Sequence, residues 1–379
     1  MGERDEAGQS QAGSRQGARR HHRAPQHRGR CVGEGDRFSS LELFAPERPS
    51  IIGTILSAPE RTDDVHPDTA GALHIEPPER RLAKTFEYKT STLFRGDCLD
   101  WLRLREPRSI HAVVTDPPYG LVEYSVQQQT KLRNGKGGVW RIPPAFDGHQ
   151  RSPVPRFTTL SEAELAQLSR FFRLWAEALL PKLVPGAHVV VASNPLVSHL
   201  VSVAMGEAGL ERRGEIVRLV MTMRGGDRPK NAHEEFPDVS VMPRSMWEPW
   251  LLFRKPTEGR VADNLRIWGT GGLRRVSENQ PFGDVIRSHP TSPAERRLAP
   301  HPSLKPQAFL RQIVRAVLPL GKGVIVDPFA GSGSTLAAAV ALGYECIGIE
   351  LDPAYVEVAR QAIPALSELR TMEKDQASL

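Results

Sequence analysis

The chain has 379 residues, which is enough for one large α/β domain with additional segments. Its 50 basic residues, most of them Arg, outnumber the 44 acidic ones and give a net charge of +6, which favours contact with phosphate groups but does not define a fold. Three widely spaced cysteines argue against a disulfide framework and a zinc site, so we expect reduced thiols and no metal. No apolar run approaches the ~20 residues that cross a bilayer, so we expect no membrane span and a cytoplasmic location.

The N-terminal part lacks the periodicity of folded segments. Residues 1–37 are rich in Gly, Gln, Ser, His and Arg, and residues 38–85 contain short apolar stretches broken by prolines. Segments with so few apolar residues cannot bury enough surface to become ordered. We therefore predict a disordered basic tail and an irregular lead-in over residues 1–85, followed by the folded domain over residues 86–379.

From residue 86 onward, short β-branched runs alternate with helical stretches. This rhythm is typical of βαβ units, so we predict an α/β fold with a doubly wound sheet. The predicted strands are 91–95, 111–115, 188–193, 215–222, 250–254, 324–327 and 345–350, and the predicted helices are 161–180, 307–318 and 335–342. Ser161 and Glu164 form a capping box at the start of the first helix. Two long connections, 120–158 and 254–300, interrupt the rhythm, and loops of this length are usually functional.

The sharpest local signal is the segment Asp116-Pro117-Pro118-Tyr119, which follows a predicted strand. Doubly wound sheets bind ligands at the carboxyl ends of their strands, so the segment should lie at the rim of a site. The amino nitrogen of adenine or cytosine is a poor nucleophile unless acceptors hold its hydrogens, and Asp116 with the Pro117 carbonyl supplies two acceptors. Tyr119 would stack on a base rotated out of the duplex. The segment therefore predicts chemistry at a base amino group.

The second signal is a glycine-rich turn after the predicted strand 324–327. A helix and a second strand follow, and that strand ends in an acid about twenty residues beyond the turn, as in nucleotide-cofactor units. Gly331 and Gly333 would let the backbone approach a ligand closely, Glu350 would accept ribose hydroxyls, and Asp327 could meet a cationic amino group. The turn is not G-x-G-x-x-G and no G-K-[ST] segment follows, which favours a sulfonium nucleoside over a pyrophosphate cofactor.

In combination, these motifs resemble the DNA amino-methyltransferases in the permuted beta-group order, in which D-P-P-Y precedes the glycine turn. Gly96-Asp97-Cys98 resembles the family's G-D-C segment, and His301-Pro302 with Lys305-Pro306 resembles its H-P-x-x-K-P segment. The resemblance implies a Rossmann-like methyltransferase fold, circularly permuted and with inserted target-recognition segments. It covers residues from about 93 to 363 and is weak in 120–158 and 222–300.

The resemblance also implies S-adenosylmethionine as the cofactor and a set of binding residues. Asp97 and Cys98 would contact its adenosine end, and His301 and Lys305 would hold its methionine end. The glycine turn and the strand after it would contribute Asp327, Phe329, Ala330, Gly331, Gly333, Ser334, Thr335, Glu350 and Asp352. Ser334 replaces the Thr usual in the family and keeps a hydroxyl.

The predicted activity is site-specific methylation of adenine N6 in double-stranded DNA, with Asp116, Pro117, Pro118 and Tyr119 as the catalytic segment. Within the resemblance, Asp rather than Ser before Pro-Pro-Tyr favours adenine, and cytosine N4 is the alternative because the chemistry is the same. The alternative of another class is a catalytically silent protein that binds S-adenosylmethionine and DNA. The sequence leaves open a cognate restriction endonuclease and the choice between monomer and homodimer.

Target recognition is predicted in the two weakly matching regions, 120–158 and 222–300. Both contain many basic residues, which suit contacts with phosphates and base edges. The arginines singled out in the second region are Arg260, Arg266, Arg274, Arg275 and Arg287.

Overall fold

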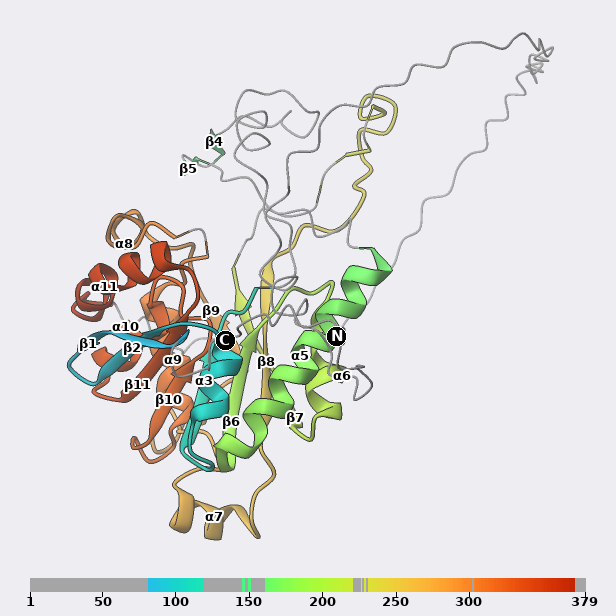
Figure 1. The fold of residues 1–379 in the computed structure, drawn as a ribbon. Coiled ribbons are helices and arrows are strands. Elements are labelled where there is room, and N and C mark those ends of the chain that lie inside the picture. The colour runs from blue at the N-terminus through green and yellow to red at the C-terminus, as the bar shows by residue number, and fades with distance from the viewer. Residues whose placement is uncertain are drawn as a thin grey trace, which may run out of the picture. The chain divides into compact units, whose positions relative to one another are not determined.

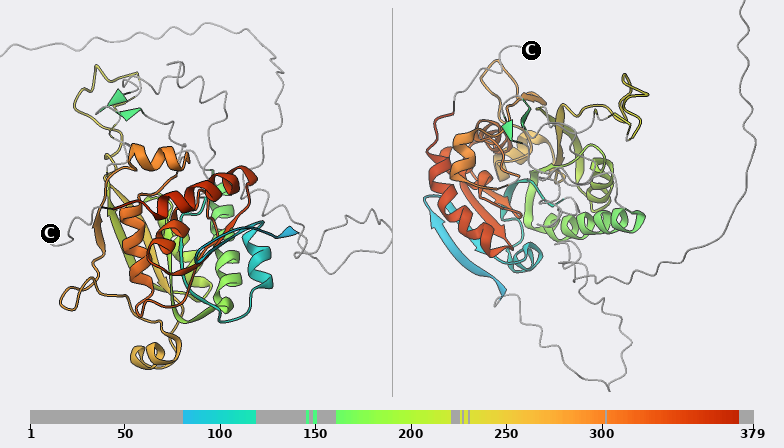
Figure 2. Two further views of the ribbon diagram at one scale, coloured as in Figure 1. Left: turned by 90° about the vertical axis from the view of Figure 1, so that its left-hand side faces the viewer. Right: turned by 90° about the horizontal axis from the view of Figure 1, so that it is seen from above.

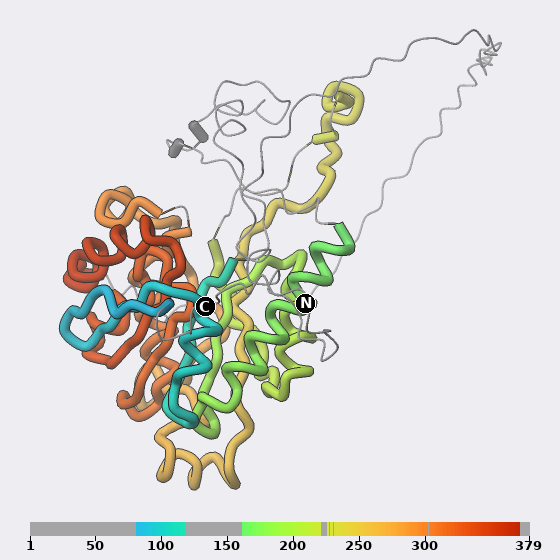
Figure 3. The backbone as a smooth tube through the Cα atoms, in the orientation of Figure 1, coloured from blue at the N-terminus to red at the C-terminus, as the bar shows by residue number. Residues whose placement is uncertain are grey.

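The computed structural model describes residues 81–118, 161–220, 226, 228–229, 231–301 and 303–371, together with the backbone of 145–146 and 149–150. The predicted N-terminal tail, most of the lead-in and the predicted recognition segment 120–158, apart from those four backbone positions, lie outside the described residues. Figure 1 shows the arrangement of the elements, and Figure 3 follows the same backbone as a tube. No described helix is long and apolar enough to cross a membrane.

A nine-stranded mixed sheet forms the centre of the described fold, with the strand order β1-β2-β11-β10-β3-β6-β8-β7-β9. Its strands are β1 (Ala83–Tyr88), β2 (Ser91–Arg95), β3 (Ile110–Thr115), β6 (Leu183–Ala192), β7 (Glu211–Leu219), β8 (Trp247–Arg254), β9 (Val285–Arg287), β10 (Val324–Asp327) and β11 (Glu345–Glu350). β2, β11, β10, β3 and β6 are parallel, and β8 lies antiparallel between β6 and β7. A separate two-stranded pair is formed by β4 (Ala145–Phe146) and β5 (His149–Gln150).

Helices connect the strands. They are α3 (Cys98–Leu104), α5 (Glu162–Leu179), the 3₁₀ turn η2 (Leu180–Lys182), α6 (Ser198–Glu207), α7 (Val261–Trp268), α8 (Pro293–Leu298), α9 (Gln307–Val317), α10 (Ser334–Ala341) and α11 (Pro353–Ser367). The capping box predicted for α5 is present, since Ser161 Oγ accepts from Glu164 N and the Glu164 carboxylate accepts from Ser161 N. This cap fixes the first turn of the long crossover helix.

The two faces of the sheet carry separate cores. Successive side chains of a strand point to opposite faces, so Val113 of β3 packs with α3, α5 and α6, whereas its neighbour Val114 packs with α9, α10 and α11. Figure 2 shows these two sets of helices on either side of the strands. The arrangement confirms the predicted doubly wound α/β fold, in which parallel strands are buried on both faces and read as continuous apolar runs.

The elements that the sequence analysis misses are β1, α3, β4, β5, α6, α7, β9, α8 and α11. β1 is an edge strand whose side chains are mostly accessible, so it lacks the apolar alternation of a strand with a buried face. The connection 254–300 is not irregular as predicted, because it contains α7, β9 and α8. The predicted strand 250–254 is part of β8, which lies inside the region 222–300 and belongs to the central sheet.

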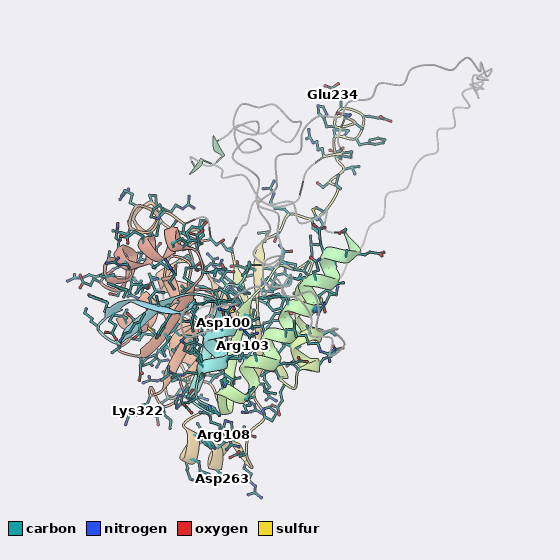
Figure 4. The ribbon with its side chains drawn as sticks, in the orientation of Figure 1. Asp100, Arg103, Arg108, Glu234, Asp263 and Lys322 are labelled. Atoms are coloured by element: carbon teal, nitrogen blue, oxygen red, sulfur yellow. The ribbon has the colours of Figure 1, made fainter. Side chains whose placement is uncertain are left out.

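The direction of β8 determines where the connection after it begins. The parallel strands all end at one edge of the sheet, and antiparallel β8 begins at that edge with Trp247 and ends at the opposite edge with Arg254. Helix α7 therefore starts at the amino ends of the parallel strands, where Asn264 Nδ2 donates to the Pro185 carbonyl at 2.9 Å. Figure 4 labels Arg108 and Asp263 at this edge. The carboxyl edge is the one that holds the predicted site.

Candidate functional site

The two strongest sequence signals meet through neighbouring strands. β3 pairs with β10, so Thr115, at the end of β3, lies beside Asp327, at the end of β10. The Thr115 hydroxyl donates to Asp327 Oδ1 at 2.6 Å, and both side chains are buried. Asp116 follows directly and is partly buried. Residues 212 positions apart in the sequence are thus joined at the carboxyl edge of the sheet, as the parallel arrangement predicts.

Two hydrogen bonds from backbone amides to buried carboxylates fix the conformation of the glycine-rich turn. The Phe329 amide donates to Asp327 Oδ1 at 3.2 Å, and the Gly331 amide donates to Glu350 Oε2 at 2.7 Å. Gly333 has φ of 76° and caps helix α10, and a Cβ on it would lie 2.5 Å from Cγ1 of Ile363. Only glycine fits this position without a shift of its neighbours. Asp327 and the turn residues Phe329, Ala330 and Gly331 line one cavity.

Burial raises the pKa of two acids at this edge, Asp327 and Glu350. It raises the pKa of Asp327 from 3.8 to about 6, although the hydroxyls of Thr115 and Thr335 and the Phe329 amide oppose the shift by donating to the carboxylate. Burial also raises the pKa of Glu350, against the opposing effect of two backbone amides. A cation bound near either carboxylate would favour the charged form.

Lys305 joins the Asp116 segment to a second, partly buried acid. Its Nζ donates to Asp116 Oδ2 and lies 3.4 Å from Glu248 Oε1. Burial disfavours the ammonium, but the carboxylates of Asp116 and Glu248 outweigh that effect and raise the pKa of Lys305. The lysine therefore stays charged beside Asp116. The resemblance implies that Lys305 holds the methionine end of the cofactor, and the structure also pairs it with the predicted amino-hydrogen acceptor.

A cavity lies between these groups. Its lining consists of Asp116, Trp250, His301, Ser303, Lys305, Leu310, Asp327, Phe329, Ala330, Gly331, Ser332, Ser334 and Thr335. His301 packs edge-on against the Tyr355 ring with centroids 4.4 Å apart, and burial lowers the pKa of its imidazole to about 4, so the ring is neutral at physiological pH. The cavity thus combines two carboxylates, one ammonium and a close-approach glycine turn.

Several predicted site residues lie at the same edge without lining the cavity. Asp97 Oδ1 caps α3 by accepting from the Leu99 amide at 2.7 Å, and Asp352 Oδ1 caps α11 by accepting from the Ala354 amide at 2.7 Å. Gly96 N donates to the Glu350 carbonyl at 3.0 Å, which places Asp97 next to the end of β11. Cys98 is buried, and burial raises its pKa well above the ordinary value. The predicted residues that are absent from the cavity lining are Asp97, Cys98, Pro117, Pro118, Gly333, Glu350 and Asp352, and Tyr119 lies outside the described residues.

Sequence reasoning missed Glu248, Trp250, Ser303, Leu310 and Ser332. Ser303 and Ser332 lie inside the recognised motifs, where their position alone could have indicated them. Trp250 and Leu310 read as core residues of a strand and a helix. Glu248 had one usable signal, since a carboxylate near the start of an otherwise apolar strand must find a partner when its charge is shielded from water.

The predicted recognition arginines do not share one edge of the molecule. Arg287 is exposed at the end of β9, where it pairs in register with Leu219 at the carboxyl end of β7. Arg260 and Arg266 lie at α7, on the opposite edge, where Arg266 pairs with Asp263.

The other two arginines of this set have partners within the fold. Arg274 Nη1 donates to the Tyr344 hydroxyl at 2.7 Å, just before β11 begins. Arg275 Nε donates to the Glu278 carbonyl at 3.0 Å, and the Arg275 backbone carbonyl accepts from Arg315, near the end of α9. Of the five predicted arginines, the fold therefore places Arg287 on the side of the cavity.

Comparison with known proteins identifies the family. The model of the N6/N4 DNA methylase family matches residues 110–361. The Type II methyltransferase M2.DpnII of Streptococcus pneumoniae is 32% identical over 278 residues, covering 73% of this chain and 90% of its own length. The Type II methyltransferase M.HindIII of Haemophilus influenzae is 22% identical over 294 residues, covering 70% and 93%. Among solved structures, the cytosine-N4-specific PvuII DNA methyltransferase aligns with a TM-score of 0.47 at 17% identity, over 75% of this chain and 88% of that one.

The chain therefore belongs to the N6/N4 DNA methylase family. Its family match covers most of the described fold, including the Asp116 segment and the glycine turn. It is a DNA methyltransferase of that family, which confirms the resemblance found in the sequence.

Proposed function

We propose that this protein transfers a methyl group from S-adenosylmethionine to adenine N6 at specific sites in double-stranded DNA. One observation carries the proposal: Asp116 lines the same cavity as the glycine turn and Lys305. The base acceptor and the groups suited to a charged nucleoside cofactor thus face one space. Residues 86–379 would form the catalytic domain, acting on DNA in the cytoplasm.

The charged groups in and beside the cavity suit those of S-adenosylmethionine. That cofactor has a cationic amino group, a carboxylate and a sulfonium. Asp327 is a buried carboxylate in the lining and suits the amino group, while the Lys305 ammonium suits the carboxylate. A Cβ at Gly331 would lie 3.2 Å from His301 Nε2, so glycine keeps that part of the cradle clear. Glu350, at the end of β11, would accept the ribose hydroxyls.

The reaction requires a base amino group that is nucleophilic. When bound, S-adenosylmethionine supplies an electrophilic methyl carbon. The Asp116 carboxylate and the Pro117 carbonyl would accept the two amino hydrogens, which favours a pyramidal nitrogen with an available lone pair. Tyr119, beyond the described residues, would stack on a base rotated out of the duplex. The protein contributes mainly by positioning the reactants, an effect that can lower a barrier by ~7–11 kcal/mol.

Adenine is preferred over cytosine because Asp rather than Ser precedes Pro-Pro-Tyr. The carboxylate of Asp116 accepts from Lys305 and, in the proposed reaction, also from the base. Cytosine N4 would use the same acceptors. The geometry of Asp116 therefore supports a base amino group as the target, and the preference for adenine over cytosine rests on the Asp-Pro-Pro-Tyr motif. Target recognition is proposed for 120–158 and for the parts of 222–300 at the carboxyl edge.

Product analysis tests the proposal. The purified protein is incubated with labelled S-adenosylmethionine and unmethylated genomic DNA, and the DNA is digested to nucleosides for mass identification. N6-methyladenine is the expected product. N4-methylcytosine would replace the proposed base, and no methylated nucleoside, despite cofactor binding, would point to the silent binder.

A further inference from the structure

Four charged side chains form a chain of contacts that begins in the cavity lining with Asp116 and Lys305 and continues outside it. Asp116 contacts Lys305, Lys305 lies 3.4 Å from Glu248, and Glu248 Oε2 accepts from Arg218 Nη1 at 2.7 Å. Two carboxylates alternate with two cations, so the group is neutral as a whole. Burying such charges is unfavourable unless each has a partner, and this sequence of contacts gives every member one.

Arg218 is fixed independently of the cavity. Its Nε donates to Ser288 Oγ at 3.0 Å, its Nη2 donates to the His289 carbonyl at 3.1 Å, and its guanidinium lies 5.1 Å from the Phe309 ring centroid. Arg218 and Glu248 are also direct cross-strand partners in the β7–β8 register. Arg218 therefore holds the Glu248 carboxylate in a fixed position.

The two oxygens of Glu248 face different cations. Oε2 accepts from Arg218 and, at 3.4 Å, from Trp250 Nε1, while Oε1 faces Lys305. Lys305 is thus shared between a fixed acid and the acid proposed to act on the base. The Lys305 side chain is only 10% exposed, so in the cofactor-free protein the loss of Glu248 would leave Asp116 to compensate its charge.

We propose that Glu248, held by Arg218, is a positioning residue that gives Lys305 a second counter-ion and so lets Asp116 accept hydrogen bonds from the target base. The inference rests on the proposed function. When Lys305 can pair with Glu248, release of Asp116 does not leave a buried ammonium unpaired. When Glu248 is replaced by a neutral residue, Asp116 and the carboxylate of the cofactor are the acids left to Lys305, so the ammonium holds Asp116 more strongly and competes with the base for its oxygens.

The test compares Glu248→Gln with Glu211→Gln in single-turnover and steady-state DNA methylation. Glu211 pairs with Arg254 at 2.6 Å across the same two strands but at the opposite edge, which makes it the matched control. We expect kcat of Glu248→Gln to fall roughly 10- to 100-fold with little change in KM for DNA, and the control to match the wild type. Wild-type kcat in folded Glu248→Gln would overturn the proposal.

A double-mutant cycle separates positioning from a general structural effect. If Glu248 acts through Lys305, Glu248→Gln should reduce kcat little further in a Lys305→Met background. Fully additive losses would overturn the proposal. If Glu248→Gln does not fold, Glu248→Asp takes its place, because it keeps the charge but withdraws it from Lys305. Absence of methylation by the wild type would instead refute the proposed function itself.

Discussion

Replacing Asp327 with asparagine should stabilise the protein at neutral pH while weakening cofactor binding. The carboxylate is buried, and its pKa in the folded protein is about 6 instead of 3.8. Asparagine has nearly the same shape, and its Oδ1 can still accept from Thr115 and from the Phe329 amide. The substitution therefore removes a buried charge without opening a space.

The sign and size follow from the shift. A raised folded-state pKa means that the folded protein holds the proton more tightly than the unfolded chain, so the stability from this group is fully present below pH 3.8 and is lost as pH rises to about 6. A shift of about 2 units corresponds to about 3 kcal/mol. Roughly 2 kcal/mol of that difference should develop between about pH 4.5 and about pH 7.

The measurement is urea unfolding of the cofactor-free wild type and Asp327→Asn at about pH 4.5 and about pH 7. Other titrating groups are common to the two proteins, so the change in their stability difference isolates Asp327. We expect the free energy of unfolding of Asp327→Asn to increase relative to that of the wild type as the pH rises. Parallel pH dependence of the two proteins would refute the assignment of a raised pKa to Asp327.

Four further outcomes are expected. The cofactor affinity of the wild type, measured by titration calorimetry, should increase as pH rises through about 6 and level off above it, because charged Asp327 favours a cationic amino group. The affinity of Asp327→Asn should show no such increase. Asp116→Ala should abolish methyl transfer yet bind S-adenosylmethionine, and wild-type turnover would remove Asp116 from the mechanism. Gly333→Ala should lower the free energy of unfolding by ~2–4 kcal/mol, because its Cβ would lie 2.5 Å from Ile363. Gly343 has a similar φ and no atom within 4 Å of a Cβ, so the control Gly343→Ala should lower the free energy of unfolding by only ~1 kcal/mol. Neutralising exposed Arg287 should reduce the salt dependence of DNA binding, and the matched change at Arg266 should not. If the two variants show the same slope of log affinity against log salt concentration, Arg287 is not the arginine that contacts DNA.

The strands that carry the site could be predicted because they are local patterns. The strands 324–327 and 345–350 have the predicted bounds, and Asp116 lies one residue after the end of β3. Apolar β-branched runs bounded by glycine or proline specify a buried parallel strand with little help from the rest of the chain. The capping box of α5 is local for the same reason, since all its partners lie within four residues.

Pairings across the sheet could not be predicted from the same patterns. Nothing in the sequence around Glu248 indicates that it will lie against Lys305 and Arg218, because those contacts depend on the order β3-β6-β8-β7 and on the direction of β8. The same direction sends Arg260 and Arg266 to the edge away from the cavity, although their composition matched a DNA-binding segment.

The sequence by itself therefore determined the fold class, the family and the two motifs that meet at the cavity, since each depends on residue types at short, fixed spacing. Only the tertiary structure decided which charges share a partner. Coulomb interactions and burial depend on distances in space, and in a mixed sheet those distances follow from strand order and direction, which no local pattern contains.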